Sequence, residues 1–394
     1  MAAILYLFRF GLLWLSLRHT RSMHFETLAV HAGRTIDPTT GAVTPPIHLS
    51  TTFERDVDGE YPRGFSYSRE DNPNRRMLEE CLAALEGGKE ALVFASGLAV
   101  LSAILQGLEP GDHIIAPQDA YYGMRQSMTT VFAKWPLEIA YVNMTALDEV
   151  SAAVKPNTRL IWIETPSNPL LDITDLAAVA AIARRANAIS VCDSTFTTPA
   201  LQRPFDFGID MVMHSTTKYL GGHADLLGGA LITKFDNYLF ERVRNAQRYG
   251  GAVPSAFDCW LTLRGISTLP WRMLGHGQNA LAMANFLNSH QAIERVYYPE
   301  LATHSGHEIA MRQMKGGGGM ISFQVRGCRA DAMRVVAKTG LFTRATSLGG
   351  THSYIEHRAS IEGHGTKTPQ NLLRASIGLE NASDLIADLE QALA

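Results

Sequence analysis

The sequence has few cysteines, little net charge and no CxxC pair. Its four cysteines are scattered, which argues against a disulfide framework and a zinc site, so no metal is expected. The net charge of −3 gives no reason to expect nucleic acid or an anionic membrane as a partner. Hydrophobic residues make up 46% of the 394 residues and charged residues 19%, which predicts a sizeable core rather than disorder. Reduced thiols favour a cytoplasmic protein.

The N-terminal apolar run, residues 4–17, is too short to span a bilayer comfortably. Basic residues follow it between positions 18 and 21, whereas a secretory signal carries its charge before the apolar run and ends in small residues. Because the first acidic residue is Glu26, an organelle transit peptide stays open as an alternative. We favour an over-long start, with residues 1–22 as an apolar leader of doubtful status and Met23 as the working initiator.

The rest of the chain divides into three parts by pattern. Residues 23–75 are rich in proline and glycine and predict an extended arm. Residues 76–265 alternate helical periodicity with short apolar strands, which predicts a large, mostly parallel sheet with helices on both faces. Residues 266–394 predict a smaller C-terminal α/β domain. The fold class is therefore α/β, and the sequence shows no internal repeat.

One lysine stands out, in the run MVMHSTTKYLGGH at residues 211–223. An apolar strand is followed by hydroxyl residues that include Ser215 and Thr217, then by Lys218, then by paired glycines. A rigid strand end, phosphate-binding hydroxyls and flexible backbone are what a lysine needs to hold an aldehyde cofactor. Upstream, a short apolar strand ends in Asp193, which would be costly to bury without a partner. A Schiff-base lysine plus an aspartate for a pyridinium nitrogen predict pyridoxal phosphate.

Three further segments follow predicted strands. Ser96, Gly97 and Leu98 open a helix, and amides at a helix N-terminus can bind phosphate, although a plain turn is the alternative. An aromatic ring from the pair Tyr121-Tyr122 could lie on a pyridine face, or the pair could be ordinary half-buried tyrosines.

The third segment is the turn Glu164-Thr165-Pro166-Ser167-Asn168-Pro169. Its two prolines hold Asn168 stiffly, where the amide could bond the phenolate oxygen of the cofactor. All these segments lie at carboxyl ends of predicted strands, which is where open α/β sheets bind ligands.

As a set, these segments resemble the Cys/Met metabolism family of pyridoxal phosphate enzymes. That family includes cystathionine γ-synthases, cystathionine lyases, methionine γ-lyases and O-acylhomoserine sulfhydrylases, and the resemblance runs from about residue 27 to the C-terminus. It implies the fold type I architecture of pyridoxal phosphate-dependent transferases. The motifs that carry it are Tyr67-Ser68-Arg69, Leu85-Glu86-Gly87-Gly88, Phe94-Ala95-Ser96-Gly97, the Glu164–Pro169 turn, Ser215–Lys218, Ser347-Leu348-Gly349-Gly350 and Leu373-Arg374-Ala375-Ser376-Ile377-Gly378.

The resemblance implies roles for individual residues. Lys218 would form the imine and shuttle protons, and Tyr122 would stack on the ring and help deprotonate the incoming amine. Tyr67 and Arg69 would reach the phosphate of a neighbouring subunit, which implies a homodimer at least and a homotetramer as the expected assembly. The implied cofactor-binding residues are Tyr67, Arg69, Ser96, Gly97, Leu98, Tyr122, Asp193, Thr195, Ser215, Thr217 and Lys218. The implied substrate-binding residues are Arg374, which would pair with the α-carboxylate, together with Asn168, Ser347, His352 and Arg125.

Two departures from the family pattern bear on specificity. His352 stands where many synthases and γ-lyases carry a glutamate that meets the distal amino group of cystathionine. Arg125 replaces a small polar residue, next to Met124 where methionine γ-lyases carry a cysteine. A histidine and an arginine would suit an acidic or neutral substrate tail. The alternative is that both side chains face the protein.

The predicted function is trans-sulfuration on γ-substituted amino acids in methionine and cysteine metabolism. One lysine would remove the α-proton and then move a β-proton, so that a γ-substituent leaves, as in a cystathionine γ-synthase or γ-lyase. Alternatives are an O-acylhomoserine sulfhydrylase, a γ-lyase for another substrate, an aminotransferase and a non-catalytic homologue.

Overall fold

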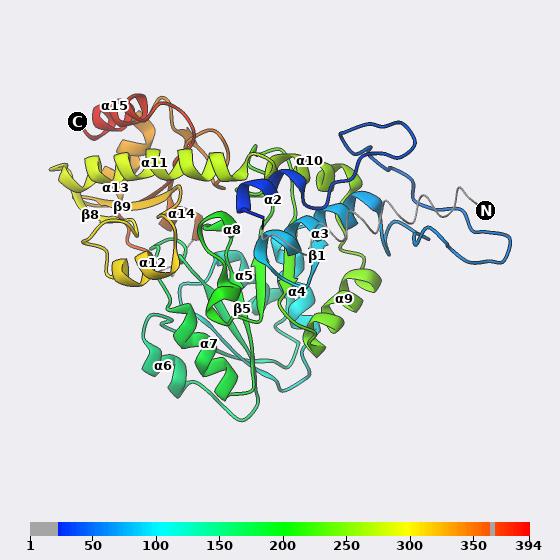
Figure 1. The fold of residues 1–394 in the computed structure, drawn as a ribbon. Helices are drawn as coiled ribbons and strands as arrows, with labels where there is room; N and C mark the ends of the chain where they lie inside the picture. The colour runs from blue at the N-terminus through cyan, green and yellow to red at the C-terminus, as the bar shows by residue number, and fades with distance from the viewer. Residues whose placement is uncertain (1–22, 363–366) are drawn as a thin grey trace.

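The computed structural model describes residues 23–362 and 367–394, so the predicted leader lies outside the described residues. Within those ranges, no helix is long and apolar enough to cross a membrane. Two sheets organise the described chain, and the long helix α11 (Leu269–Ser289) runs along the smaller one towards α2 (Phe25–His31) (Figure 1). The predicted α/β class is confirmed.

Seven strands form the larger sheet in the order β1-β7-β6-β5-β4-β2-β3. Neighbouring strands are parallel except that β7 is antiparallel to both β1 and β6. The strands are β1 (Glu90–Phe94), β2 (His113–Pro117), β3 (Glu138–Val142), β4 (Thr158–Glu164), β5 (Ile189–Asp193), β6 (Met211–His214) and β7 (Gly229–Thr233). The central strands are almost continuously apolar because helices cover both faces.

The helices of this unit are α3 (Pro73–Glu86), α4 (Gly97–Gln106), α5 (Tyr122–Gln126), α6 (Leu147–Ala152), α7 (Leu176–Arg185), α8 (Thr198–Leu201), α9 (Tyr238–Gly250) and α10 (Ala256–Ile266), with a π-helical turn at Ser127–Val131 and a 3-10 turn at Pro204–Phe207. Strand β1 shows how both faces are covered. Leu92 and Phe94 join the core with α4 and α9, whereas Ala91 and Val93 join the core with α3 and α10. This alternation is what a period of two residues requires.

The smaller sheet has the order β10-β11-β12-β9-β8. Its elements are β8 (Ile293–Tyr297), α12 (His307–Gln313), β9 (Met320–Val325), α13 (Arg329–Lys338), β10 (Thr343–Arg344), β11 (Tyr354–His357), α14 (Arg358–Glu362), β12 (Leu372–Ser376) and α15 (Ala382–Leu393). Apolar side chains of α11, α13 and α15 bury one core against this sheet. The predicted boundary at residue 266 falls at the last residue of α10, shortly before α11, and a division into domains there stays a prediction.

The predicted arm contains one helix that the sequence reading missed. Helix α2 packs Ala29 into the core beside α3. Residues 32–72 carry no helix or strand beyond an isolated bridge between Thr52 and Tyr67, and their loops project from the body in Figure 1.

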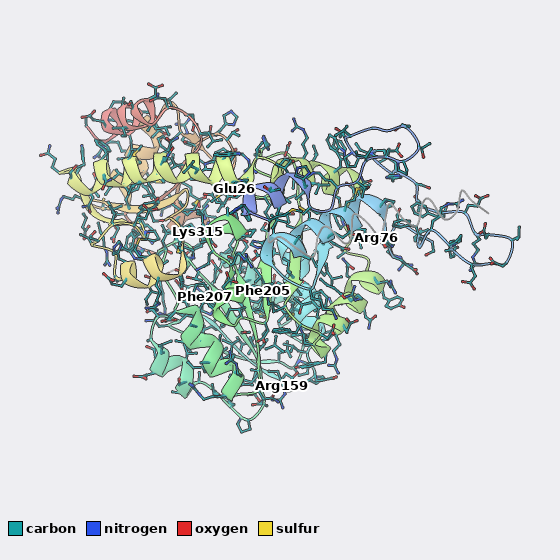
Figure 2. All side chains as sticks on the ribbon, viewed as in Figure 1. Glu26, Arg76, Arg159, Phe205, Phe207 and Lys315 are labelled. Atoms are coloured by element: carbon teal, nitrogen blue, oxygen red, sulfur yellow. The ribbon has the colours of Figure 1, made fainter. Side chains whose placement is uncertain are left out.

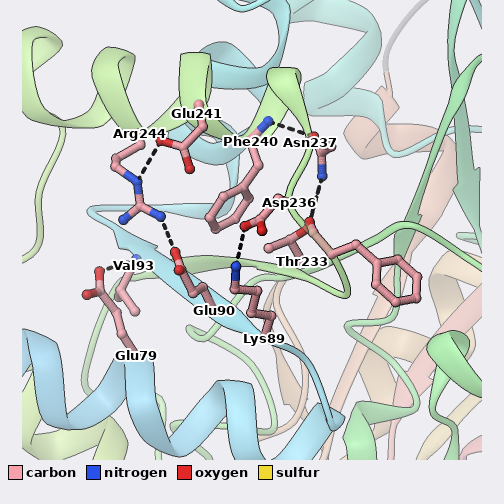
Figure 3. Close-up of polar contacts among 11 residues, drawn as sticks. Glu79, Lys89, Glu90, Val93, Thr233, Asp236, Asn237, Phe240, Glu241 and Arg244 are labelled. Carbon is pink, nitrogen blue, oxygen red and sulfur yellow. Dashed lines mark hydrogen bonds and ion pairs between the residues drawn. The ribbon is translucent and has the colours of Figure 1, made fainter.

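Strand β1 lies at an edge of the larger sheet, and charged side chains line that edge (Figure 3). Glu90 pairs with Arg244 of α9, and Lys89 pairs with Asp236. Asn237 caps α9 by accepting a hydrogen bond from the amide of Phe240 at 2.8 Å. Charges on an edge strand discourage pairing with another chain.

The carboxyl ends of β4, β5 and β6 face the smaller sheet. Arg159, at the start of β4, marks the opposite side, where the amino ends of these strands lie. In Figure 2 it lies far from Glu26 of α2. A ligand at the carboxyl ends therefore has both structural units around it.

Candidate active site

One cavity lies between the carboxyl ends of β4–β6, the start of α4 and the smaller sheet. It brings together most of the residues that the sequence predicted, although they are spread over almost 280 positions of the chain. The predicted residues that line it are Ser96, Gly97, Leu98, Asn168, Asp193, Thr195, Ser215, Thr217, Lys218, Ser347 and Arg374.

Lys218 is held at the centre of this cavity by contacts from both units. Its Nζ donates a hydrogen bond to Oγ of Ser347 at 2.8 Å. Behind it, the Thr217 hydroxyl accepts from the amide of Gly228 at 3.0 Å, which fixes the loop after β6. Burial lowers the pKa of the Lys218 amine to about 8, and the positive charge of Arg374 adds to the shift. The amine is therefore much more available as a base or nucleophile than an exposed lysine.

Ser347 adopts a backbone conformation that is uncommon for a residue with a side chain. Its φ is +86°, in the region that favours glycine. Such conformations are costly and persist where the surrounding structure imposes them, often at functional sites. Here the strained residue is the one that contacts the amine of Lys218.

The N-terminus of α4 forms a cradle suited to a phosphate. Ser96 caps the helix by accepting from the amide of Ala99 at 3.1 Å. A Cβ on Gly97 would lie 3.2 Å from Cβ of Ser215 and 3.0 Å from Cε of Met213, so glycine lets the helix start approach the residues before Lys218. Amides and hydroxyls thus converge from two elements at a positive helix end.

Asp193 ends β5 and is oriented by Thr195. Oδ1 of Asp193 accepts hydrogen bonds from the amide of Thr195 at 3.0 Å and from its hydroxyl at 2.5 Å. The same hydroxyl also accepts from the amide of Ser215 at 2.9 Å. Burial raises the pKa of Asp193, and the hydrogen bonds from Thr195 oppose that rise. The residues of this cavity fit pyridoxal phosphate, because an amine, an anion and a phosphate cradle surround one space.

Arg374 of β12 lies opposite, buried to 4% exposure. Nη1 donates to Oδ1 of Asn168 at 2.8 Å, and Nη2 donates to the carbonyl of Ser347 at 3.3 Å. Nη2 also lies 2.6 Å from Oε1 of Glu356. Burial lowers the pKa of the guanidinium to about 10, so it stays charged at neutral pH. A fixed, charged guanidinium is suited to a carboxylate.

Three residues of this region were missed by the sequence reading. Arg358 and Glu164 line the cavity, and Glu356 bridges Arg358 to Arg374. Arg358 is 2% exposed, and within the described ranges its Nη2 has no hydrogen-bond partner. The local sequence YIEH of β11 carries no signal that would have singled out Glu356 or Arg358, because their burial depends on how the strand is packed.

The structure places Tyr121, and not Tyr122, on the Lys218 cavity. The amide of Tyr121 donates to Oε2 of Glu164 at 2.9 Å, and α5 begins one residue later. Tyr122 lines a neighbouring cavity, together with Arg125. Consecutive residues at a helix start point in different directions, so the two tyrosines face different cavities, and the predicted stacking of Tyr122 on the ring stays a prediction.

The residues predicted at the distal end do not line this cavity. His352 is exposed, and its Nδ1 lies 3.3 Å from Oγ1 of its neighbour Thr351. It lies in a bend where the next residue, Ser353, points inwards and donates to Glu380 at 2.9 Å. Arg125 lines the neighbouring cavity.

Tyr67 and Arg69 lie away from the cavity within one chain. The guanidinium of Arg69 lies 5.6 Å from the ring centroid of Tyr67 and donates to the carbonyl of Arg248 at 2.6 Å. Their expected place is at a neighbouring subunit, which stays a prediction.

A half-buried lysine amine, an aspartate and a helix-end phosphate cradle at the carboxyl ends of an α/β sheet define a pyridoxal phosphate-dependent enzyme. The chain belongs to the Cys/Met metabolism PLP-dependent enzyme family, whose model matches residues 26–394. The predicted family and cofactor are thereby confirmed.

Relatives of known name cover nearly the whole chain. Cystathionine gamma-synthase of Mycobacterium tuberculosis is 48% identical over 373 residues, which are 93% of this chain and 96% of the relative. Cystathionine gamma-lyase of Dictyostelium discoideum is 45% identical over 376 residues, 93% of this chain and 97% of the relative. The crystal structure of cystathionine gamma synthase from Xanthomonas oryzae pv. oryzae, in complex with aminoacrylate and cysteine, matches with a TM-score of 0.91 and 41% identity, covering 95% of this chain and 98% of that one.

Proposed function

We propose that this enzyme carries out carbon–sulfur chemistry at the γ-carbon of amino acids, as a cystathionine γ-synthase or γ-lyase. The observation that carries the proposal is the meeting of Lys218 and Arg374 in one cavity, each contacting Ser347. The arginine offers a place for the α-carboxylate, and the lysine offers a base beside it. Relatives named as synthase and as lyase, 48% and 45% identical, support the same chemistry.

The residues of the cavity divide the work of holding the cofactor and substrate. Gly97, Leu98, Ser215 and Thr217 would hold the phosphate, and Asp193 would face the ring nitrogen. Tyr121 would lie on the ring face. When bound, the cofactor supplies an electron sink for charge that develops at the α-carbon.

Lys218 would do the proton transfers. Its neutral amine takes the α-proton of a substrate whose carboxylate is held by Arg374 and Asn168. The same flexible side chain then moves a proton at the β-carbon, which allows the γ-substituent to leave. The Ser347 hydroxyl, 2.8 Å from Nζ, keeps the amine over the reacting carbons between these transfers.

We place the protein in the cytoplasm and expect a homodimer as the minimal active unit, within a homotetramer. Tyr67 and Arg69 would complete the phosphate site of the neighbouring subunit. Their position outside the cavity of their own chain supports that arrangement.

A product screen tests the proposal. The enzyme is given cystathionine, homocysteine, methionine, O-succinyl-homoserine and O-acetyl-homoserine, each with and without cysteine. Cystathionine formed from an O-acyl-homoserine and cysteine identifies a synthase. Release of 2-oxobutyrate, ammonia and cysteine from cystathionine identifies a γ-lyase, whereas pyruvate, ammonia and homocysteine would identify cleavage at the β-carbon. Turnover that requires a keto acid and releases neither thiol nor ammonia would overturn the proposal in favour of an aminotransferase.

A further inference from the structure

Glu164 is a buried carboxyl group beside the aspartate at the cofactor site. It ends β4 in register with Asp193, which ends the neighbouring parallel strand β5. Both side chains line the Lys218 cavity, and Glu164 is 7% exposed. Because adjacent strands lie about 4.8 Å apart, the two carboxyl groups are near neighbours.

Two neighbouring carboxylates, one buried and one half-buried, are costly to ionise together. Asp193 is the better anion, because Oδ1 accepts two hydrogen bonds from Thr195. Glu164 accepts one backbone hydrogen bond, from Tyr121 at 2.9 Å.

The charged groups around Glu164 favour its neutral form. Burial raises the pKa of Glu164 well above its usual range, and the charges of Asp193 and Asp119 raise it further. The amide of Tyr121 and the charge of Arg358 oppose that rise. Asp193 is therefore the member of the pair that ionises first.

We propose that Glu164 acts as a neutral carboxylic acid, a positioning residue that holds the Tyr121 backbone beside the cofactor ring and leaves Asp193 as the anion that faces the ring nitrogen. The inference rests on the proposed placement of Asp193 at the ring nitrogen. The neutral acid accepts from Tyr121 with one oxygen and keeps a proton on the other. A second negative charge is thus kept away from the ring nitrogen, while the residue that precedes α5 stays fixed.

The test compares two variants of the full-length holoenzyme. Glu164→Gln keeps the acceptor and a donor without charge, whereas Glu164→Met keeps the length and removes both. The readouts are the visible circular dichroism of the bound cofactor and the rate at which cofactor is released on dilution. We expect Glu164→Gln to match the wild type in both, and Glu164→Met to release cofactor about tenfold faster with a weakened signal.

Two results would overturn the inference. A Glu164→Gln variant that releases cofactor as fast as Glu164→Met would show that the ionised carboxylate is needed. A Glu164→Met variant that matches the wild type would show that the residue positions nothing. If Glu164→Met fails to fold, the Glu164→Gln result alone still decides between the neutral and the ionised form.

Asp193→Asn separates this inference from the proposed function. We expect Asp193→Asn to shift the visible band and weaken cofactor binding, whatever Glu164 does. An Asp193→Asn variant with an unchanged band would instead overturn the placement of Asp193.

Discussion

Glu356 and Arg374 occupy opposite positions on the antiparallel strands β11 and β12, and Oε1 of Glu356 lies 2.6 Å from Nη2 of Arg374. The same oxygen lies 3.0 Å from Nη1 of Arg358. One buried carboxylate is thus shared by two buried guanidiniums. Since Asn168 holds the other terminal nitrogen of Arg374, the guanidinium has a fixed plane before any substrate arrives.

The fixed fork of Arg374 predicts the effect of a conservative replacement. In Arg374→Lys, one ammonium cannot satisfy both Asn168 and Glu356 and still bind a carboxylate in two places. We expect KM for the amino-acid substrate to rise roughly 100-fold. Steady-state kinetics with the substrate found by the product screen measure this change. Arg344→Lys, at an exposed position, is the matched control, and an unchanged KM in Arg374→Lys would contradict the assignment.

The depressed pKa of Lys218 predicts how cofactor uptake depends on pH. Only the neutral amine adds to an aldehyde, so uptake by stripped enzyme should rise with pH while the amine loses its proton. Because the pKa of Lys218 is lowered to about 8, the rate should level off near there rather than climb towards 10.5. The growth of the visible band after adding pyridoxal phosphate measures the rate.

Lys218→Ala is the control for that experiment. This variant should form no absorption band of the lysine–cofactor imine at any pH, and it should have no turnover. If the rate of cofactor uptake by the wild type kept rising well above pH 8, the pKa of the Lys218 amine would not be lowered as its burial requires.

A neighbouring pair of tyrosines offers a matched comparison. Tyr121 lines the Lys218 cavity, and Tyr122 lines the adjacent one. Tyr121→Ala removes the ring proposed to lie on the cofactor and should weaken cofactor binding about tenfold. Tyr122→Ala should leave cofactor affinity almost unchanged. Equilibrium binding of pyridoxal phosphate to the two stripped variants measures these affinities. A larger loss in Tyr122→Ala than in Tyr121→Ala would assign the stacking ring to Tyr122.

Strand patterns in the sequence predict some features of the cavity well. The ends of apolar strands placed Lys218, Asp193 and Asn168 at one edge of a sheet, because parallel strands share that edge. The pattern does not distinguish Tyr121 from Tyr122, since the direction of each side chain at a helix start depends on the backbone angles there.

Residues in the last third of the chain were harder to predict. The involvement of Glu356 depends on the register of β11 against β12, which the local sequence does not specify. His352 was predicted at the distal end of the substrate because of its place after the Ser347–Gly350 motif. In the structure it lies in a bend, and its side chain is exposed. The shared carboxylate and Arg358 therefore emerged only from the packed structure.

A buried pair behind the site predicts a stability effect. Oε1 of Glu86 lies 2.5 Å from Nε2 of His214, the last residue of β6, and both side chains are at most 1% exposed. In Glu86→Leu the imidazole loses its partner in a dry interior, which should cost about 2–3 kcal/mol. Urea unfolding of the holoenzyme measures the loss as a lower midpoint.

The double variant Glu86→Leu/His214→Phe completes the cycle. Because it removes both polar groups, it should recover part of the stability lost in Glu86→Leu. The solvent-accessible pair Arg334 and Asp331 gives the contrast, since its Arg334→Leu variant should leave the urea midpoint almost unchanged. If Glu86→Leu shifted the midpoint no more than Arg334→Leu, the buried contact would contribute nothing to holding α3 against the strand that leads to Lys218.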